Sequence, residues 1–193
     1  MKITQCESCG SFVKSYDTIN LSSKNKTRVL CSKCYNETVS EYQGLDFQHV
    51  TFDPVTIKDS DGVPHTFDFR TNLFGDKVFI EALEIKEGKP SGYNFTAYGE
   101  AEDDILKIFK KLFEHLRRAL SQKHIEEGDF TRYRITDNDL VRGRIEWDDN
   151  EDGRVPCLVI DGKYLSWEEF GKMLMSYEGF HFKLEIFERS EER

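Results

Sequence analysis

Apolar positions along the second quarter of the chain recur at every second residue. Three segments show this spacing: TFDPVTI (51–57), VPHTFDF (63–69) and DKVFIEALEI (76–85). Alternation of this kind is typical of β-strands. The alternation in VFIEALEI is imperfect, which favours a strand that is covered on both faces. DSDG at 59–62 predicts a turn between the first two strands.

Apolar positions over residues 101–123 instead recur three and four apart. They are Ile105, Ile108, Phe109, Leu112, Phe113, Leu116 and Leu120. Acidic residues precede this stretch and basic residues close it, as the helix dipole prefers. We therefore expect a helix with one face on a sheet. A second helix is predicted over 167–177, because Ser166 and Glu169 form a capping box and Gly179 follows.

The last third of the chain again shows strand patterns. RYRIT (132–136) and LVRGRIEW (140–147) predict an adjacent pair of strands, and Asp161-Gly162 predicts a tight hairpin after CLVI. FHFKLEIFE (180–188) predicts a closing strand in which Phe182, Leu184 and Ile186 share one face. The fold class is therefore α+β, with a mainly antiparallel sheet and two packed helices.

Residues 1–45 form a separate module in this interpretation. A hairpin with a turn at about Ser22 to Asn25 is followed by a short helix that ends at Gly44. Residues 46–193 form the α+β domain. The net charge of the chain is −9, but residues 1–46 carry +1 and the remainder carries −10. An acidic body repels phosphate backbones, so a nucleic-acid grip by the whole molecule is disfavoured.

Membrane and export signals are missing from the pattern. No apolar run approaches the roughly 18 residues of a spanning helix, and MKITQCESCG has no apolar signal-peptide core. We expect a cytoplasmic protein without membrane contact. Its thiols would stay reduced there, which favours metal ligation over disulfides.

Four cysteines dominate the candidate chemistry. Cys6 and Cys9 form one C-x2-C pair, 21 residues separate it from the next, and Cys31 and Cys34 form the second. Each pair closes a short chelate loop, which suits a tetrahedral ion of zinc size. Gly10 can adopt the positive φ that turns backbone N–H groups toward sulfur. Cys31 and Cys34 lead into a helix-compatible run, whose N-terminus favours thiolates.

The order of knuckle, hairpin and cysteines at a helix start resembles a treble-clef zinc finger more than a zinc ribbon. The resemblance covers residues 6 to about 44 and implies one bound Zn²⁺, with family roles from nucleic-acid binding to protein docking. Four sulfurs leave no open coordination position, so the site is expected to be structural. A rubredoxin-like iron site shares CxxCG, but Cys34 is not followed by glycine. A redox role for the second pair is weaker, because two further cysteines complete a metal site.

Other candidates favour plain structural roles. Asp148, Asn150 and Asp152 match half of a calcium loop, but no bidentate glutamate follows at the required position, so an acidic turn between strands is favoured. Cys157 is expected to be a buried, inert thiol. The five histidines lie far apart in sequence, and surface or packing roles are the default for each.

Four arginines could form a basic patch if their two strands are adjacent. They are Arg132, Arg134, Arg142 and Arg144. Acidic neighbours make a self-neutralised surface the favoured interpretation.

Three functions remain open. The leading hypothesis is a non-enzymatic protein-interaction module with an unidentified protein partner. The second is nucleic-acid binding through the finger, with Tyr16 or Tyr35 for stacking and four cations for phosphates: Lys24, Lys26, Arg28 and Lys33. The third is an enzyme whose site is assembled in the α+β domain from distant residues. The chain shows no catalytic motif, and the stretch from 155 to 186 resembles bacterial proteins of uncharacterised function, which implies a bacterial source.

Overall fold

The computed structural model describes residues 2–23 and 26–188. The described residues form an α+β fold of antiparallel sheets and three α-helices, as predicted. The N-terminal part holds two hairpins and a helix. Its elements are β1 (Ile3–Gln5), β2 (Phe12–Lys14), the 3₁₀ turn η1 (Ser15–Asp17), β3 (Thr18–Ser23), β4 (Lys26–Cys31) and α1 (Ser32–Gln43). The predicted turn at Ser22 to Asn25 falls on residues 24 and 25, which lie outside the described residues, between the end of β3 and the start of β4.

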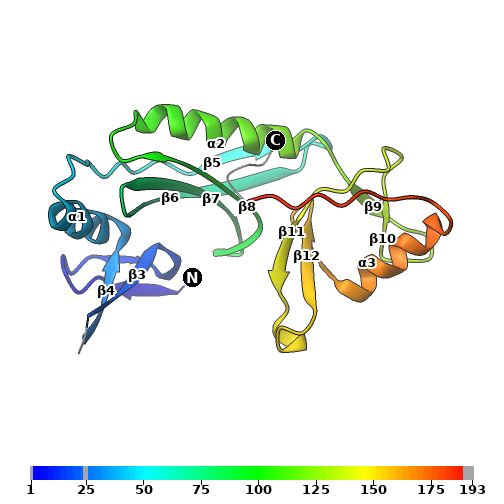
Figure 1. Cartoon of the computed structure of the whole chain (residues 1–193), viewed down its shortest axis with the longest axis horizontal. Helices are drawn as coiled ribbons and strands as arrows, with labels where there is room; N and C mark the ends of the chain where they lie inside the picture. Colours follow the sequence, from blue (N-terminus) through cyan, green and yellow to red (C-terminus); the bar gives the residue numbers. More distant parts are fainter. Residues whose placement is uncertain (1, 24–25, 189–193) are drawn as a thin grey trace.

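A four-stranded sheet forms the centre of the molecule. Its order is β5-β6-β7-β8, all antiparallel, with β5 (Val55–Lys58), β6 (Pro64–Phe74), β7 (Lys77–Lys86) and β8 (Lys89–Glu100). Helix α2 (Ile105–Leu120) lies along one face of this sheet (Figure 1). Asp104 caps its N-terminus, and Leu112, Leu116 and Leu120 bury its apolar stripe on the sheet. The long amphipathic helix predicted from the sequence is confirmed.

The last part of the chain builds a second, smaller core. Its elements are the hairpin β9 (Ile125–Glu127) and β10 (Tyr133–Ile135), the sheet β11 (Arg144–Trp147), β12 (Pro156–Ile160) and β13 (Lys163–Ser166), helix α3 (Trp167–Leu174), and the 3₁₀ turns η2 (Asp149–Glu151) and η3 (Met175–Tyr177). Six buried apolar residues meet here: Ile125, Ile135, Leu158, Ile160, Leu165 and Met173. The predicted capping box at Ser166 and Glu169 is confirmed.

The predicted pairing of RYRIT with LVRGRIEW is wrong. Strand β10 pairs with β9 and β11 pairs with β12, so the two arginine-bearing strands belong to different sheets. Sequence adjacency favoured a hairpin, but the intervening residues 136–143 are irregular and β12 is the better partner for β11. Three of the arginines are neutralised by nearby carboxylates: Arg132 by Glu169 at 3.2 Å, Arg134 by Glu126 at 2.6 Å and Arg144 by Glu146 at 2.6 Å.

The predicted closing strand is also wrong. Residues 181–188 are extended, but no described strand pairs with them. Phe182, Leu184 and Ile186 are 91%, 72% and 73% exposed. Alternation specifies which side chains would share a face, whereas a strand also needs a neighbouring backbone for its hydrogen bonds. The described part of this chain supplies none.

The N-terminal module docks onto the central sheet through Asn36 of α1. The Asn36 side chain is fully buried and lies at the edge of β6. Its Nδ2 donates to the carbonyl of Thr71 at 2.8 Å, and the Leu73 N–H donates to its Oδ1 at 2.8 Å. One amide side chain thereby replaces the donor and acceptor that a neighbouring strand would offer. The ring of His49 lies 2.8 Å from the same Nδ2.

Charged groups extend this docking contact. Lys14 and the Tyr16 hydroxyl both bind the carboxylate of Asp68 on β6. Arg70 donates to the carbonyl of Tyr16 at 2.6 Å and also binds Glu81 on β7. The module and the central sheet are therefore linked by a connected polar network.

The hairpin turn between β12 and β13 contacts the end of the central sheet. Asp161 and Gly162 have φ values of 49° and 67°, as a two-residue type I′ turn requires, which confirms the predicted hairpin. The carbonyl of Gly162 accepts a hydrogen bond from Lys86 at 3.3 Å. A Cβ on Gly162 would lie 2.8 Å from the Tyr93 ring and 3.1 Å from a Glu84 oxygen. Only glycine satisfies both the turn and this close approach.

We expect Gly162→Ala to lower the free energy of unfolding by about 2 to 4 kcal/mol, because it adds left-handed backbone strain to a steric overlap. Urea denaturation measures this change. Gly171→Ala is the matched control, since Gly171 lies in α3 with nothing within 4 Å of an added Cβ. That control should gain up to about 1 kcal/mol from helix propensity. Equal stabilities of the two variants would contradict the assigned contact.

Candidate metal centre

The first cysteine pair lies in the tight turn between β1 and β2. The Cys6 N–H donates to the carbonyl of Ser11 at 2.9 Å, and the Gly10 N–H donates to the carbonyl of Cys6 at 2.9 Å. Gly10 has a φ of 75°, which confirms the positive value expected there. This backbone turn brings the side chains of Cys6 and Cys9 to one side.

The second pair lies where β4 passes into α1. Cys31 is the N-cap residue of α1, and its Sγ accepts the N–H of Cys34 at 3.5 Å. The helix ends at Gly44 with a φ of 69°. Both predictions, cysteines at a helix start and a glycine at its end, are confirmed. The Cys31 N–H also donates to the Sγ of Cys6 at 3.2 Å, which ties the two pairs together.

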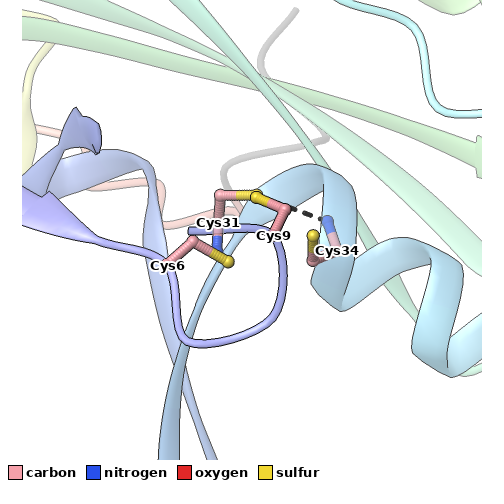
Figure 2. Close-up of side chains that lie close together, drawn as sticks. All are labelled: Cys6, Cys9, Cys31 and Cys34. Carbon is pink, nitrogen blue, oxygen red and sulfur yellow. Dashed lines mark hydrogen bonds between the residues drawn. The ribbon is translucent and has the colours of Figure 1, made fainter. Parts of the chain in front are cut away.

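All four sulfur atoms lie within 4.8 Å of one another. Figure 2 shows Cys6 and Cys9 on the turn facing Cys31 and Cys34 at the start of the helix. Zinc–sulfur bonds of about 2.3 Å place the sulfurs of a tetrahedral site about 3.8 Å apart. The Sγ atoms of Cys9 and Cys31 are 4.0 Å apart. The arrangement therefore fits a tetrahedral ion that takes all its ligands from sulfur.

The site is largely shielded from solvent. Cys6, Cys31 and Cys34 are 1%, 5% and 7% exposed, while Cys9 is exposed. Leu30 is fully buried beneath the sulfurs, and Tyr35 packs on the same cluster. An ion held by four sulfurs in this setting would have no position left for water or substrate.

The thiols differ in how easily they ionise. Burial raises the pKa of Cys6, but hydrogen bonds from the backbone N–H groups of Cys9, Cys31 and Ser8 outweigh it and lower that pKa to about 6. Burial, together with the neighbouring thiols, raises the pKa of Cys34 to about 12. A bound cation would favour the thiolate form of every ligand, since metal binding releases their protons.

The four cysteines form the only cluster of three or more potential metal ligands in residues 2–23 and 26–188. The half-match to a calcium loop is an acidic turn between β11 and β12, as favoured. There the Asp148 carboxylate accepts the Asn150 N–H at 2.9 Å. Cys157 is buried, 8% exposed, and burial raises the pKa of its thiol.

The cations proposed for nucleic-acid binding are spread over the finger. Lys24 lies outside the described residues, as does the side chain of Lys26, whose backbone begins β4. Arg28 is half-buried on β4, and Lys33 is exposed on α1 with its Nζ 3.9 Å from Glu37.

The two rings proposed for stacking are engaged inside the molecule. The Tyr16 hydroxyl binds Asp68, and Tyr35 packs against the cysteine cluster.

A buried charged cluster in the body was missed by the sequence analysis. His65 on β6 lies between two carboxylates, with its Nδ1 2.7 Å from Glu84 and its Nε2 3.3 Å from Asp59. Glu84 is 1% exposed and also accepts the Tyr93 N–H at 2.8 Å. Lys86 lies 3.1 Å from Glu84. The signal was present in β7, where Glu84 continues the inward-facing series of strand positions.

This charged cluster belongs to neither of two cavities in the described part of the chain, which have volumes of about 310 and 280 Å³. The first is lined by Lys2, Ser15, Tyr16, Gly88, Lys89 and Pro90, and the second by Ile145, Glu146, Trp147, Gly153, Val155 and Pro156. His65, Asp59 and Glu84 belong to neither. Their arrangement joins the central sheet to the β12–β13 turn through Lys86.

Three family models match consecutive segments of the chain, and each is described only as a domain of unknown function. Residues 5–46 match DUF7685, residues 48–121 match DUF7686 and residues 124–191 match DUF7713. No curated protein and no solved structure gives a match. None of the helices in the described part of the chain has both the length and the apolar character needed to cross a bilayer.

We expect Cys34→Ala to abolish metal binding and to lower the stability of the protein by several kcal/mol, because bound metal contributes its binding energy to folding. Elemental mass spectrometry should find one metal ion per wild-type chain and well below one per variant chain. Cys157→Ala is the control, since Cys157 is buried but lies outside the cluster. If both variants retained the same metal content, the four-cysteine site would be refuted.

We expect the stabilising effect of His65 to depend on pH. Hydrogen bonds to Glu84 raise the pKa of His65 above its ordinary 6.5, although burial opposes this. Its contribution is therefore complete below pH 6.5 and disappears as the pH rises through the raised pKa. Burial raises the pKa values of Glu84 and Asp59, but hydrogen bonds from His65 and backbone N–H groups lower them overall, below their ordinary 4.5 and 3.8. Their contribution is lost as the pH falls through those lowered values.

His65→Gln should therefore cost about 1 to 3 kcal/mol between about pH 4.5 and 6.5, and less at higher pH. Chemical denaturation at several pH values measures the difference from wild type. His181→Gln, at an exposed position, serves as the control and should show no such trend. A pH-independent cost for His65→Gln would show that the ring acts only through its shape.

Proposed function

We propose that this protein is a cytoplasmic, non-enzymatic interaction protein whose N-terminal module is a treble-clef-like zinc finger. The observation that carries the proposal is the closed cluster of four sulfurs within 4.8 Å of one another. One Zn²⁺ bound by Cys6, Cys9, Cys31 and Cys34 would hold the turn, the β3–β4 hairpin and α1 together. Zinc suits this set because it is redox-inert and prefers tetrahedral sulfur ligands.

The order of elements supports a treble clef over a ribbon. The first cysteine pair lies in a turn, a hairpin follows, and the second pair begins α1. A ribbon would place the second pair in another hairpin turn. An iron site of the rubredoxin kind would also favour a glycine after Cys34, where Tyr35 stands and continues the helix.

The module's docking supports an interaction role. Asn36 and Arg70 tie it to β6 by hydrogen bonds, so a bound ion would also fix the position of the finger relative to the body. A cavity of about 310 Å³ lies where the module meets the β7–β8 turn, and Lys2 and Lys89 are among its lining residues. Such a cleft favours an acidic segment of a protein partner.

Two experiments test the metal part of the proposal: identification of the bound metal and its exchange for Cd²⁺. We expect elemental analysis of protein purified without chelator to find zinc, and Cd²⁺ exchange to preserve the fold and partner capture. A structural ion tolerates such replacement when the coordination geometry is kept. Iron in the purified protein, or loss of the fold on Cd²⁺ exchange, would contradict a structural zinc.

The interaction part is tested by affinity capture with the full chain. We expect a partner held by wild type to be lost with Lys2→Glu/Lys89→Glu, because both changes reverse charge in the cleft. Lys110→Glu on α2 is the control, since this exposed side chain lies away from the cleft. Absence of any partner that depends on the cleft would refute the proposal. Salt-sensitive retention on nucleic acid that Arg28→Glu/Lys33→Glu abolishes would favour the alternative function.

A further inference from the structure

The second sheet has one unfinished edge. Strand β11 pairs with β12 on one side and with no described strand on the other. Ile145 and Trp147 point to the same face as the buried residues Leu158 and Leu165, yet they are 56% and 67% exposed. The core of this sheet therefore stops one strand short of covering its own apolar side chains.

The C-terminal segment has the pattern of the missing strand. Residues 180–188 are extended, and their alternate apolar side chains Phe182, Leu184 and Ile186 are all exposed. This segment therefore carries the apolar side chains that a strand covering Ile145 and Trp147 would need. Uncovered apolar surface of this extent on a soluble protein indicates an interaction site.

An antiparallel arrangement matches the apolar positions and two pairs of opposite charges, whereas a parallel arrangement with Phe182 opposite Ile145 matches the apolar positions and one such pair, Lys183 with Glu146. In an antiparallel arrangement, the opposed pairs are Leu184 with Ile145, Phe182 with Trp147, Lys183 with Glu146, and Glu185 with Arg144. Apolar residues then meet on the core face, and opposite charges meet on the other face, where Arg144 already pairs with Glu146 and Lys183 with Glu185 within one copy. A parallel arrangement that places Leu184 opposite Ile145 would instead place Lys183 opposite Arg144 and Glu185 opposite Glu146. Like charges directly opposite each other destabilise a sheet.

The segment of the same chain cannot take this register along β11, although Figure 1 shows it turning back from α3 and, in that view, crossing the upper ends of β11 and β12. Helix α3 starts after Ser166, at the end of the sheet where Trp147 lies, and Figure 1 shows it leading away from β11. With η3 it advances about 18 Å. The five Cα–Cα steps from Tyr177 to Phe182 span at most about 17 Å. To pair with β11 in this register, these residues would have to return along the roughly 18 Å length of α3 and η3. They would also have to cross about 14 Å, the width of three strand spacings.

We propose that this protein forms a homodimer in which the segment Phe180–Phe187 of each copy pairs antiparallel with β11 of the other copy. The exchange is reciprocal, so each copy both donates and receives a strand, as two-fold symmetry requires. Gly179, with a φ of 88°, lies at the hinge between η3 and the donated segment. The inference goes beyond the proposed zinc-finger function, because it concerns a different surface and needs neither the metal nor the cleft.

The first test is the solution mass of the full, metal-loaded chain by light scattering over a range of concentrations. We expect a dimer, and we expect Leu184→Asp and Trp147→Asp each to shift it to a monomer by burying a charge in the new sheet. Both positions are exposed within one copy, so the fold and the metal content of each variant should be retained. Phe130→Asp, at a fully exposed position outside the proposed interface, is the control and should remain dimeric. A wild-type monomer at all concentrations would overturn the proposal.

The second test fixes the register by disulfide formation in a Cys157→Ala background. Directly opposed residues have Cα atoms about 4.5 to 5.5 Å apart, within the range of a disulfide. Mixing a copy that carries Ile145→Cys with a differently tagged copy that carries Leu184→Cys should give a cross-linked heterodimer. Lys183→Cys in place of Leu184→Cys should fail to cross-link, because the side chain at position 183 points to the other face.

A disulfide within one monomeric chain of the Ile145→Cys/Leu184→Cys double variant would overturn the exchange in favour of folding back. Zinc content and cleft-dependent capture would be unaffected by that result, so the two proposals fail separately.

Discussion

Four sulfur atoms within 4.8 Å of one another form an arrangement that a cation would stabilise. Without a cation, four thiolates would repel one another in this shielded site. Four protonated thiols could not bind a metal, so they would not hold the turn and the start of the helix together through metal bonds. The position of α1 follows from this constraint, because Cys31 and Cys34 set where the helix begins. Asn36 comes two residues later and enters the edge of β6. A bound ion would therefore fix the finger and, through the helix, its attachment to the body.

A second constraint acts where the two cores of the body meet. The junction is polar: Glu84 is buried on the face of the sheet that α2 covers elsewhere, and His65 and Lys86 compensate its charge. Burying a carboxylate is costly unless it is paired and hydrogen-bonded, so the surrounding geometry must be closely specified. The backbone of Gly162 lies directly against Glu84 and Tyr93, because glycine has no side chain to separate them. This close contact helps to specify the geometry around the buried carboxylate. Polar pairing and close backbone contact together define how the smaller sheet sits on the larger one.

Local features of the fold could be predicted from the sequence, while long-range pairing could not. The stripe from Ile105 to Leu120, the capping box at Ser166, the Asp161-Gly162 turn and the cysteine spacing each depend on residues close in sequence. The partner of β11 and the neighbours of His65 depend on contacts between residues far apart in the chain, which one sequence does not specify. The extended segment after Gly179 shows the same limit. Its alternation is real, but the structure of a single chain gives it no neighbour.

The amide of Asn36 has a consequence for the metal-free protein. Beyond Phe67, strand β6 pairs with no described strand on its β5 side, and the side chain of Asn36 occupies the hydrogen-bonding groups of Thr71 and Leu73 there. An exposed strand edge is a template for pairing with other chains. If loss of the ion released α1, this edge would be uncovered on the largest sheet of the molecule. The metal would then protect the protein against aggregation, at a point in the body that it never touches.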